Sequence, residues 1–314
     1  MKDERPRVLV TGASGFVGGH LVPFLASHGW KVRCAARRPR ACADEVVVGE
    51  IDARTDWRAA LTGVEAVLHL AGRAHHPGEE GQADLYRAVN TDGTLQLARS
   101  AAAAGVRRFI HVSTILVNGS TTDGRAPFRE TDAMTPRGVY GRSKAEAENG
   151  LKEIAANSAM AVTVIRPPLI YGAGARGNFE LLVRAIRRGV PLPLASIRNR
   201  RAFLSVHNLA SFVTGRLASA QTGYEIFLVA DAEQISTPEF ATRIATAVGR
   251  SARLVALPLP MLRMALKLAG RAEAGDSLIG SMELDLSRAL ATGWRPELTL
   301  DAALRAALAQ PQRS

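Results

Sequence analysis

The amino-acid sequence predicts an α/β protein with a doubly wound parallel sheet of the Rossmann type and a smaller, partly interleaved C-terminal lobe. Three observations predict this fold. Short apolar runs alternate with helical stretches up to residue 167, and a glycine-rich loop joins the first run to the first helix. After Pro167 the pattern changes, because prolines punctuate shorter segments. Parallel strands joined by helices imply right-handed crossovers.

The first strand is expected at 7–12, where RVLVTG is a short apolar run that ends in glycine. A helix follows from about residue 16 and stops at Gly29. The other elements of the sheet domain alternate in the same way, with strands at 31–36, 45–50, 66–72, 107–114 and 161–167 and helices at 55–61, 84–105 and 140–157.

Shorter elements are expected in the second lobe, namely strands at 203–206 and 225–230 and helices at 208–219, 238–248 and 257–270. The last helix is basic and amphipathic. We expect it to pack within the lobe, with a position on a membrane surface as the alternative. The predicted boundaries are a sheet domain over 1–170 and a second lobe over 171–314, with 203–230 returning to the sheet domain.

The formal net charge of +11 favours an anionic partner. The basic residues are scattered in pairs and triplets, and aromatic residues make up only 5% of the chain, which is too few for stacking along a single strand of nucleic acid. An anionic small molecule is therefore the preferred interpretation, ahead of nucleic acid or a membrane surface.

The cysteine content and the apolar runs bear on the compartment. Cys34 and Cys42 are too few for a disulfide framework, so we expect a reducing compartment. No apolar stretch approaches the roughly 18–20 residues of a spanning helix, and the charged N-terminus does not read as a signal peptide. We expect a cytoplasmic protein. His75 and His76 lack partners for a metal site, so no metal is predicted.

The loop TGASGFVG places Gly12, Gly15 and Gly18 between a strand and a helix. The first glycine permits a tight turn, the second lets the backbone approach a pyrophosphate, and the third lets the helix pack against the strand. The helix N-terminus adds N–H donors and partial positive charge. The strand–loop–helix context predicts a dinucleotide site rather than a plain turn.

The stretch RCAARRPR at 33–40 ends the second strand, where NAD-binding sheets carry an acid for the ribose hydroxyls. Ala36 stands there instead, followed by Arg37 and Arg38. A guanidinium suits a 2′-phosphate, so NADPH is favoured and NADH remains possible. Arg40 fits a solvated loop.

Tyr140 and Lys144 lie four residues apart on a predicted helix, and hence on one face. An ammonium beside a phenol is expected to lower the pKa of the phenol, which makes a proton donor and acceptor. Such a pair by itself is more often a surface feature. Ser113 and Thr114 end the preceding strand, at the edge where open sheets bind ligands.

Together these features resemble the extended short-chain dehydrogenases/reductases, in the nucleotide-sugar branch that includes UDP-glucose 4-epimerases. The resemblance covers nearly the whole chain, in the segments TGASGFVG (11–18), HLAG (69–72), AVNTDGT (88–94), HVSTILVNG (111–119), YGRSK (140–144), RPPLIYG (166–172) and RNRRAFLSVHNL (198–209).

The resemblance implies a role for each matching residue. Thr114 would bind the substrate C4 oxygen, Tyr140 would be the acid/base, and Lys144 would bind the nicotinamide ribose and tune the tyrosine. Asn178, Arg201 and Thr114 would contact the substrate, the first two at its diphosphate. The implied cofactor contacts are Gly12, Gly15, Phe16, Val17, Gly18, Arg37, Arg38, Glu50, Ile51, Leu70, Ala71, Gly72, Asn90 and Pro167. For Asn90 a capping or structural role is about equally compatible.

The resemblance also limits the reaction. Ile115 and Leu116 follow Thr114 where the dehydratases of the branch carry Asp–Glu, which disfavours elimination of water. We expect an NADPH-dependent 4-ketoreductase that acts on a UDP-linked 4-keto-6-deoxy sugar, most similar to the enzymes that form UDP-N-acetyl-quinovosamine. An NAD-dependent UDP-sugar 4-epimerase is the alternative, and a non-enzymatic NADP-binding regulator is a distant third. The family implies a homodimer through the helices 84–105 and 140–157.

Overall fold

The computed structural model describes residues 5–39, 42–73, 81–220, 222–268 and 277–309. Arg40, His75 and His76 lie outside the described residues, and so do the interpretations placed on them. The chain divides into two compact units. Unit 1 comprises 1–118, 133–167 and 210–228, and unit 2 comprises 119–132, 168–209 and 229–314.

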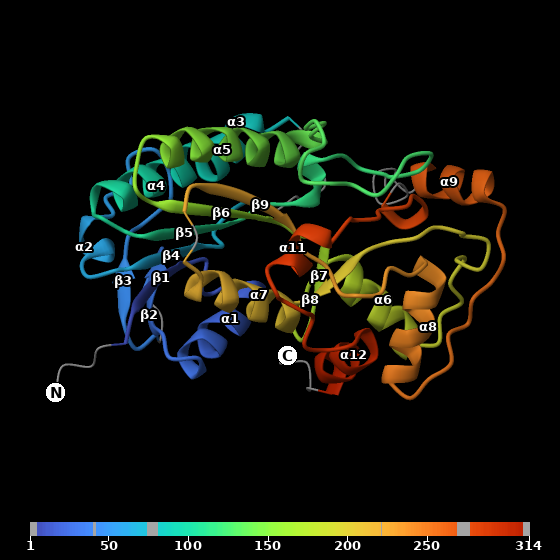
Figure 1. The fold of residues 1–314 in the computed structure, drawn as a ribbon. Coiled ribbons are helices and arrows are strands. Elements are labelled where there is room, and N and C mark those ends of the chain that lie inside the picture. The colour runs from blue at the N-terminus through green and yellow to red at the C-terminus, as the bar shows by residue number, and fades with distance from the viewer. Residues whose placement is uncertain (1–4, 40–41, 74–80, 221, 269–276, 310–314) are drawn as a thin grey trace. The chain divides into compact units, whose positions relative to one another are not determined.

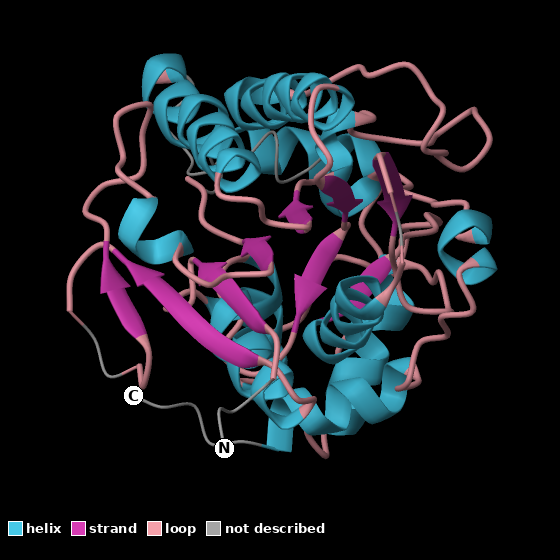
Figure 2. Ribbon diagram, turned by 60° about the vertical axis from the view of Figure 1, so that its left-hand side comes forward, coloured by secondary structure: helices cyan, strands magenta, loops and turns pink. Residues whose placement is uncertain are grey.

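Unit 1 is built on a parallel sheet, as the sequence predicted, and this sheet has seven strands (Figures 1 and 2). All neighbouring strands are parallel, in the order β3-β2-β1-β4-β5-β6-β9. The order reverses between β1 and β4, so the ends of these two strands form the crevice where open sheets bind ligands. The strands are β1 (Arg7–Thr11), β2 (Lys31–Ala36), β3 (Glu45–Val47), β4 (Ala66–His69), β5 (Arg108–Val112), β6 (Ala161–Arg166) and β9 (Tyr224–Leu228).

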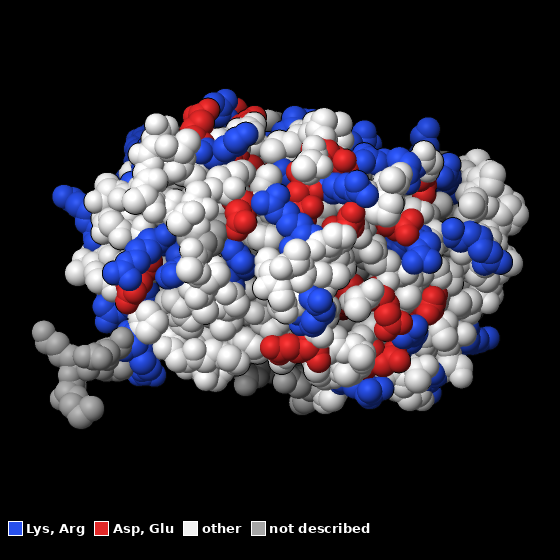
Figure 3. All heavy atoms as spheres, in the orientation of Figure 1, with Lys and Arg blue, Asp and Glu red and all other residues white. Residues whose placement is uncertain are grey.

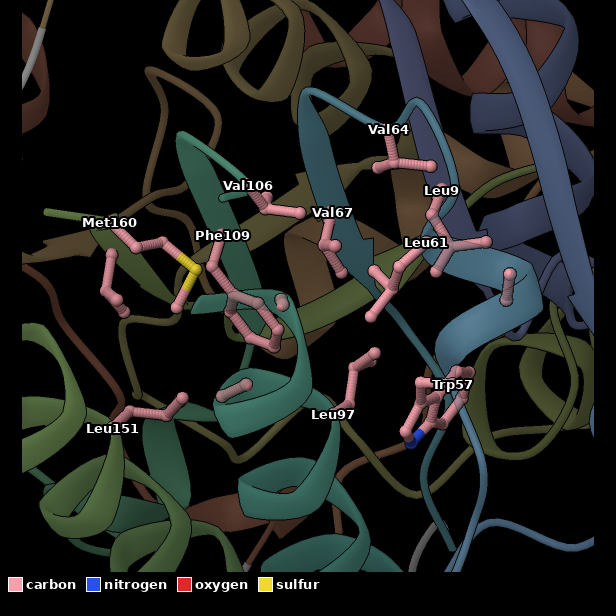
Figure 4. Close-up of a cluster of buried hydrophobic side chains, with 14 of the residues drawn as sticks. Leu9, Trp57, Leu61, Val64, Val67, Leu97, Val106, Phe109, Leu151 and Met160 are labelled. Carbon is pink, nitrogen blue, oxygen red and sulfur yellow. The ribbon is translucent and has the colours of Figure 1, made fainter. Parts of the chain in front are cut away.

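Helices cover both faces of this sheet (Figure 1). One face carries α4 (Thr94–Ala103) and α5 (Gly138–Ala156), and the other carries α1 (Phe16–Ser27) and the 210–218 part of α7 (Val206–Ala218). Between the sheet and α4 lies an apolar core, whose labelled side chains point toward one another in Figure 4. It includes the short α2 (Arg58–Leu61), and its fully or almost fully buried members include Leu9, Val67, Leu97, Phe109, Leu151 and Trp57.

The single helix predicted at 84–105 is instead three segments: α3 (Ala83–Tyr86), a π-helical turn η1 (Arg87–Gly93) and α4. Within the widened turn the Thr94 hydroxyl donates to the Asn90 carbonyl at 2.7 Å. Gly93 lets the turn lie against Ile51, whose Cγ2 would be 2.8 Å from a Cβ at that position. Such turns occur often at functional sites, and apolar periodicity does not distinguish them from α-helix.

Unit 2 contains a two-stranded parallel sheet of β7 (Leu169–Tyr171) and β8 (Phe203–Ser205). Aromatic rings pack around it, with Phe203 stacked on Phe240 at a centroid distance of 3.8 Å. Its helices are α6 (Asn178–Arg187), α8 (Thr237–Ala247), α9 (Leu259–Leu268), α11 (Ser287–Ala291) and α12 (Leu300–Ala309).

Two segments fall on the other side of the predicted domain boundary. Residues 203–209 were expected to return to the sheet domain, but β8 pairs with β7 in unit 2, and only 210–228 belongs to unit 1. Residues 119–132 were assigned to the first domain but belong to unit 2. There the amide of Phe128 donates to the Glu283 carbonyl at 2.8 Å, a long-range pairing that local sequence does not reveal.

Cys34 and Cys42 form a disulfide, which corrects the expectation of free thiols. Two cysteines cannot make a framework, but one pair can still meet where a chain folds back. Cys34 lies in β2, opposite Glu45 of the neighbouring strand β3. The loop between the two strands therefore brings Cys42 back close to Cys34. The disulfide spans the loop that carries Arg37 and Arg38.

Candidate active site

The glycine loop packs tightly against the segment that follows β4. Gly12 has φ +69°, and a Cβ there would lie 2.7 Å from the Ala71 amide nitrogen. A Cβ on Gly18 would lie 2.3 Å from the Gly12 carbonyl oxygen. Only glycine fits either position without a backbone shift, so the loop brings Leu70 and Ala71 beside the start of α1. This is the cradle that a pyrophosphate requires.

The N-terminus of α1 follows the loop directly, with Gly15 as the N-cap residue. No acidic residue lies in the first turn, where Phe16 and Val17 are partly exposed. The free N–H groups and the helix dipole therefore favour an anion at this end. The residues present fit a dinucleotide.

Two predicted cofactor residues meet after β2 and β3. Arg37 Nη1 lies 3.5 Å from Glu50 Oε2, and both side chains are more than two-thirds exposed. Arg38 is exposed too, whereas Ile51 is buried against Gly93. An exposed ion pair of this kind is weak, so Arg37 can exchange its carboxylate partner for a phosphate at little cost.

Tyr140 and Lys144 begin α5 and lie next to the end of β5. The Lys144 ammonium is buried, donating to the Val112 carbonyl at 2.8 Å and lying 3.2 Å from His111 Nε2. The lysine head is therefore held by the strand rather than by the phenol oxygen.

The pKa shifts of this pair differ from the sequence-based prediction. Burial raises the pKa of Tyr140 to about 12, with Tyr86, whose ring lies edge-on at 6.5 Å, as the second cause. Burial lowers the pKa of Lys144 to about 8, against the opposing effect of Glu148. The direction is opposite to the lowered tyrosine pKa that the sequence predicted, because burial disfavours the charged phenolate. The phenol is a proton donor at neutral pH.

A pH-dependent stability follows from Lys144. Its pKa is about 8 when folded and 10.5 when unperturbed, so the unfolded chain binds more protons between these values. Its contribution to stability is therefore lowest below pH 8 and rises up to about pH 10.5. We expect the free energy of unfolding of the wild type, minus that of Lys144→Met, to increase by about 3 kcal/mol across this window. Urea unfolding at several pH values measures it, and a constant difference would contradict it.

His111 was not predicted from the sequence and lies in direct contact with the Lys144 ammonium. It is fully buried, and burial, followed by the Lys144 and His69 charges, lowers its pKa well below the usual value, so the ring is neutral and Nε2 can accept from the ammonium. Its Nδ1 has no hydrogen-bond partner among the described residues. The signal in the sequence was a histidine in the middle of an apolar strand.

His69 lies opposite His111 in the β4–β5 register and connects the glycine loop to the π-turn. Burial lowers its pKa to about 3. Its Nδ1 lies 2.7 Å from Thr11 Oγ1 and its Nε2 lies 2.9 Å from Thr94 Oγ1. Since the Thr94 hydroxyl already donates to the Asn90 carbonyl, His69 donates through Nε2 and accepts through Nδ1.

The Asn90 side chain orders the chain after β4. Its Oδ1 accepts from the Arg73 amide at 2.7 Å, and its Nδ2 donates to the Arg73 carbonyl and to Ser143 Oγ. These bonds support a structural role for Asn90, the alternative to a contact with the cofactor. A Cβ on Gly72 would lie 3.0 Å from Asn90 Oδ1 and 3.9 Å from Lys144 Nζ, which places Gly72 at the lysine head.

The two hydroxyls after β5 have different environments. Ser113 Oγ donates to Glu148 Oε1 and is fully engaged in the core. Thr114 Oγ1 accepts from the Leu116 amide at 3.3 Å, as the cap of the 3-10 turn η2 (Ile115–Val117). Among the described residues no acceptor takes its hydroxyl proton, so Thr114 can donate to a substrate oxygen. This difference favours Thr114, as the sequence did.

Arg166 at the end of β6 and Glu148 on α5 form a buried ion pair. Arg166 Nη2 lies 2.6 Å from Glu148 Oε2, and Arg166 Nη1 donates to Asn118 Oδ1 at 2.9 Å. Both charged side chains are fully buried. Pro167, the next residue, is buried and accepts from the Ile115 amide at 2.9 Å. The network thus ties the end of β6 to the segment that carries Thr114.

The predicted substrate residues of unit 2 have contrasting surroundings. Arg201 is partly buried, donates through Nη1 to the Gly280 carbonyl at 2.6 Å, and has a pKa lowered to about 10 by burial, which the Asp123 charge opposes. Asn178 is the exposed first residue of α6. Arg200 pairs instead with Glu283 at 2.9 Å.

Most of the chain matches one known protein family. Residues 8–230 match the model of the NAD dependent epimerase/dehydratase family. The chain belongs to this family. It is therefore an enzyme of the extended short-chain dehydrogenase/reductase type with a Rossmann-like NAD(P)-binding sheet, as predicted.

Two relatives and one solved structure show what the chain is similar to. A UDP-glucose 4-epimerase of Vibrio cholerae is 37% identical over 300 residues, which cover 93% of this chain and 92% of the relative. An N-acetyl-α-D-glucosaminyl-diphospho-ditrans,octacis-undecaprenol 4-epimerase of Escherichia coli O157:H7 is 26% identical over 81% of this chain and 76% of its own. The solved structure of MoeE5 in complex with UDP-glucose and NAD has a TM-score of 0.77 at 25% identity, covering 96% of this chain and 97% of that one.

Proposed function

We propose that the protein is a UDP-hexose 4-epimerase that uses a bound nicotinamide dinucleotide. The observation that carries the proposal is the placement of Tyr140, Lys144 and the Thr114 hydroxyl at the end of β5, in a chain 37% identical to the Vibrio cholerae 4-epimerase. The sequence favoured a 4-ketoreductase with the epimerase as its alternative. The relatives support the alternative better.

The residues divide the chemistry between them. The glycine loop would hold the pyrophosphate of a nicotinamide dinucleotide, which would supply the hydride acceptor and donor. Oxidation at C4 needs Tyr140 as phenolate, which takes the proton from the C4 hydroxyl to become the phenol, and the phenol returns that proton after the keto sugar has presented its other face. Thr114 donates a hydrogen bond to the same oxygen and fixes its position. Lys144, held by Val112 and His111, adds positive charge that stabilises the phenolate form of Tyr140 during the step.

A second candidate is the NADPH-dependent 4-ketoreductase. The observation that favours it is the pair of exposed guanidiniums on Arg37 and Arg38 after β2, with Ala36 where an acid would bind the ribose. Burial also keeps the Tyr140 phenol protonated at neutral pH, which is the form that a reductase needs in order to give a proton to a ketone oxygen.

The experiment that separates them uses the purified protein with two substrates. UDP-glucose or UDP-N-acetylglucosamine is incubated with a catalytic amount of NAD, and the sugar products are resolved by chromatography. Separately, a UDP-linked 4-keto-6-deoxy sugar is mixed with NADPH, and nicotinamide absorbance is followed. Formation of the C4 epimer without net reduction of NAD supports the epimerase. Stoichiometric NADPH oxidation without epimer overturns it in favour of the reductase.

The cofactor preference is tested by Arg37→Ala. We expect the KM for NADPH to rise about 10- to 100-fold and the KM for NADH to change little, because a charge-assisted hydrogen bond to the 2′-phosphate is worth about 1.5–3 kcal/mol. The matched control is Arg58→Ala, which removes another exposed arginine that pairs with a carboxylate, that of Asp56. Equal effects of Arg37→Ala on both cofactors would show that Arg37 does not contact the 2′-phosphate.

A further inference from the structure

Helix α9 presents an apolar surface to solvent. Met261, Met264 and Leu268 are 53%, 60% and 82% exposed, the three highest values for large hydrophobic side chains in the described part of the chain. They are spaced three and four residues apart and share one face. Of the ten residues of the helix Leu262 alone is buried. The helix therefore contacts the rest of unit 2 through Leu262, as expected for packing within the lobe, and leaves its other face exposed.

Basic residues border this face. Arg263 and Lys267 are exposed and four residues apart, so they lie in a row beside the methionines and Leu268. Arg253 and the 45% exposed Val255 precede the helix, and no acidic residue occurs between 251 and 268. In Figure 3, which marks charge by colour, white and blue atoms predominate along α9. The segment is amphipathic and cationic on a chain whose net charge is +11.

We propose that α9 docks the protein on an anionic membrane surface. An interfacial helix needs apolar side chains that enter the boundary between headgroups and acyl chains, and cations that reach the phosphates beside it. Met261, Met264 and Leu268 supply the first, and Arg263 and Lys267 supply the second. Methionine is flexible and polarizable, which suits a disordered acyl environment.

The charge pattern selects a lipid surface over a second copy of the chain. A symmetric pairing of two α9 helices would bring the rows of Arg263 and Lys267 together with no acid in the segment to neutralise them. Anionic headgroups attract each such cation at short range. No helix in the described residues is long and apolar enough to cross a membrane, so the association is a peripheral one. The proposal does not depend on which sugar the enzyme takes.

The test is flotation of the full-length protein with vesicles of phosphatidylglycerol and phosphatidylcholine, and with vesicles of phosphatidylcholine alone. We expect binding to the mixed vesicles that weakens several-fold at high salt, and at least tenfold weaker binding to phosphatidylcholine. The variant Met261→Gln/Met264→Gln/Leu268→Gln should lose at least tenfold in vesicle affinity, and Arg263→Gln/Lys267→Gln at least threefold. Val190→Gln, which alters another exposed side chain of unit 2, should bind like the wild type.

Circular dichroism and cofactor binding show whether each variant folds, since none of these residues belongs to the candidate active site. Equal flotation of the wild type and the triple variant overturns the proposal, and so does the absence of wild-type binding to the mixed vesicles. Sedimentation velocity adds another overturning outcome: an oligomer that dissociates in the triple variant, without vesicle binding, would identify the face as an interface between copies of the chain.

Discussion

Tyr140→Phe is expected to lower kcat about 10²- to 10⁴-fold, while the dissociation constant of the cofactor stays within about twofold. The phenol oxygen is the group that we propose to exchange a proton with the C4 oxygen, and phenylalanine keeps the ring but removes that oxygen. The glycine loop and the Lys144 head are untouched, since Lys144 is held by Val112 and His111. Steady-state kinetics with the substrate of the proposed reaction, together with fluorescence titration of the cofactor, measures both quantities.

The matched control is Tyr86→Phe. Tyr86 is fully buried, and its ring lies edge-on to that of Tyr140 at 6.5 Å. Removing its hydroxyl leaves this ring contact in place, so we expect kcat to change by less than about fivefold. If Tyr140→Phe retained more than a tenth of the activity, or if both variants lost the same factor, Tyr140 would not be the acid/base. A loss of cofactor affinity in Tyr140→Phe alone would point to a binding role.

The placement of Tyr140 and Lys144 on one helix face could be predicted because their pairing is local. An i, i+4 spacing fixes a common helix face whatever the tertiary structure, and a hydroxyl at the end of a parallel strand reaches the ligand edge of the sheet. Gly18 could be predicted for a similar reason, because a Cβ there would meet Gly12 in the same loop. Gly12, which approaches the segment after β4, was predicted from the strand–loop–helix pattern. The parallel sheet followed from the alternation of apolar runs and helices.

His111 and the π-turn could not be predicted, because both depend on tertiary contacts. His111 reaches Lys144 only when β5 has paired with its neighbours and α5 has packed on the sheet. The π-turn depends on the contact of Gly93 with Ile51, far away in the sequence. The exposed face of α9 could not be predicted either, because amphipathic periodicity indicates that a helix has an apolar face and does not say what covers it.

The buried ion pair gives the largest expected effect on stability. Arg166 and Glu148 belong to β6 and α5, and each looks like an ordinary surface charge in the sequence. In the structure Arg166 donates three times to the Glu148 carboxylate, and Ser113 donates to the same group. Glu148→Leu would leave a buried guanidinium without its counter-charge. We expect a loss of about 3–5 kcal/mol in the free energy of unfolding, measured by urea denaturation.

Replacing both residues separates the attraction between the two charges from the free-energy cost of leaving one charge buried without its partner. In Glu148→Leu/Arg166→Met the uncompensated charge is gone, so the double variant should lose less than the sum of the two single variants, by about 2 kcal/mol or more. The exposed pair of Glu180 and Arg184 is the control, where Glu180→Gln should cost less than about 0.5 kcal/mol. Additive losses at 148 and 166 would contradict the coupling.

The same carboxylate is connected electrostatically to Lys144. Because the Glu148 charge raises the pKa of Lys144, we expect Glu148→Gln to lower that pKa further. The free energy of unfolding should then begin to rise below pH 8, which a stability–pH curve measures.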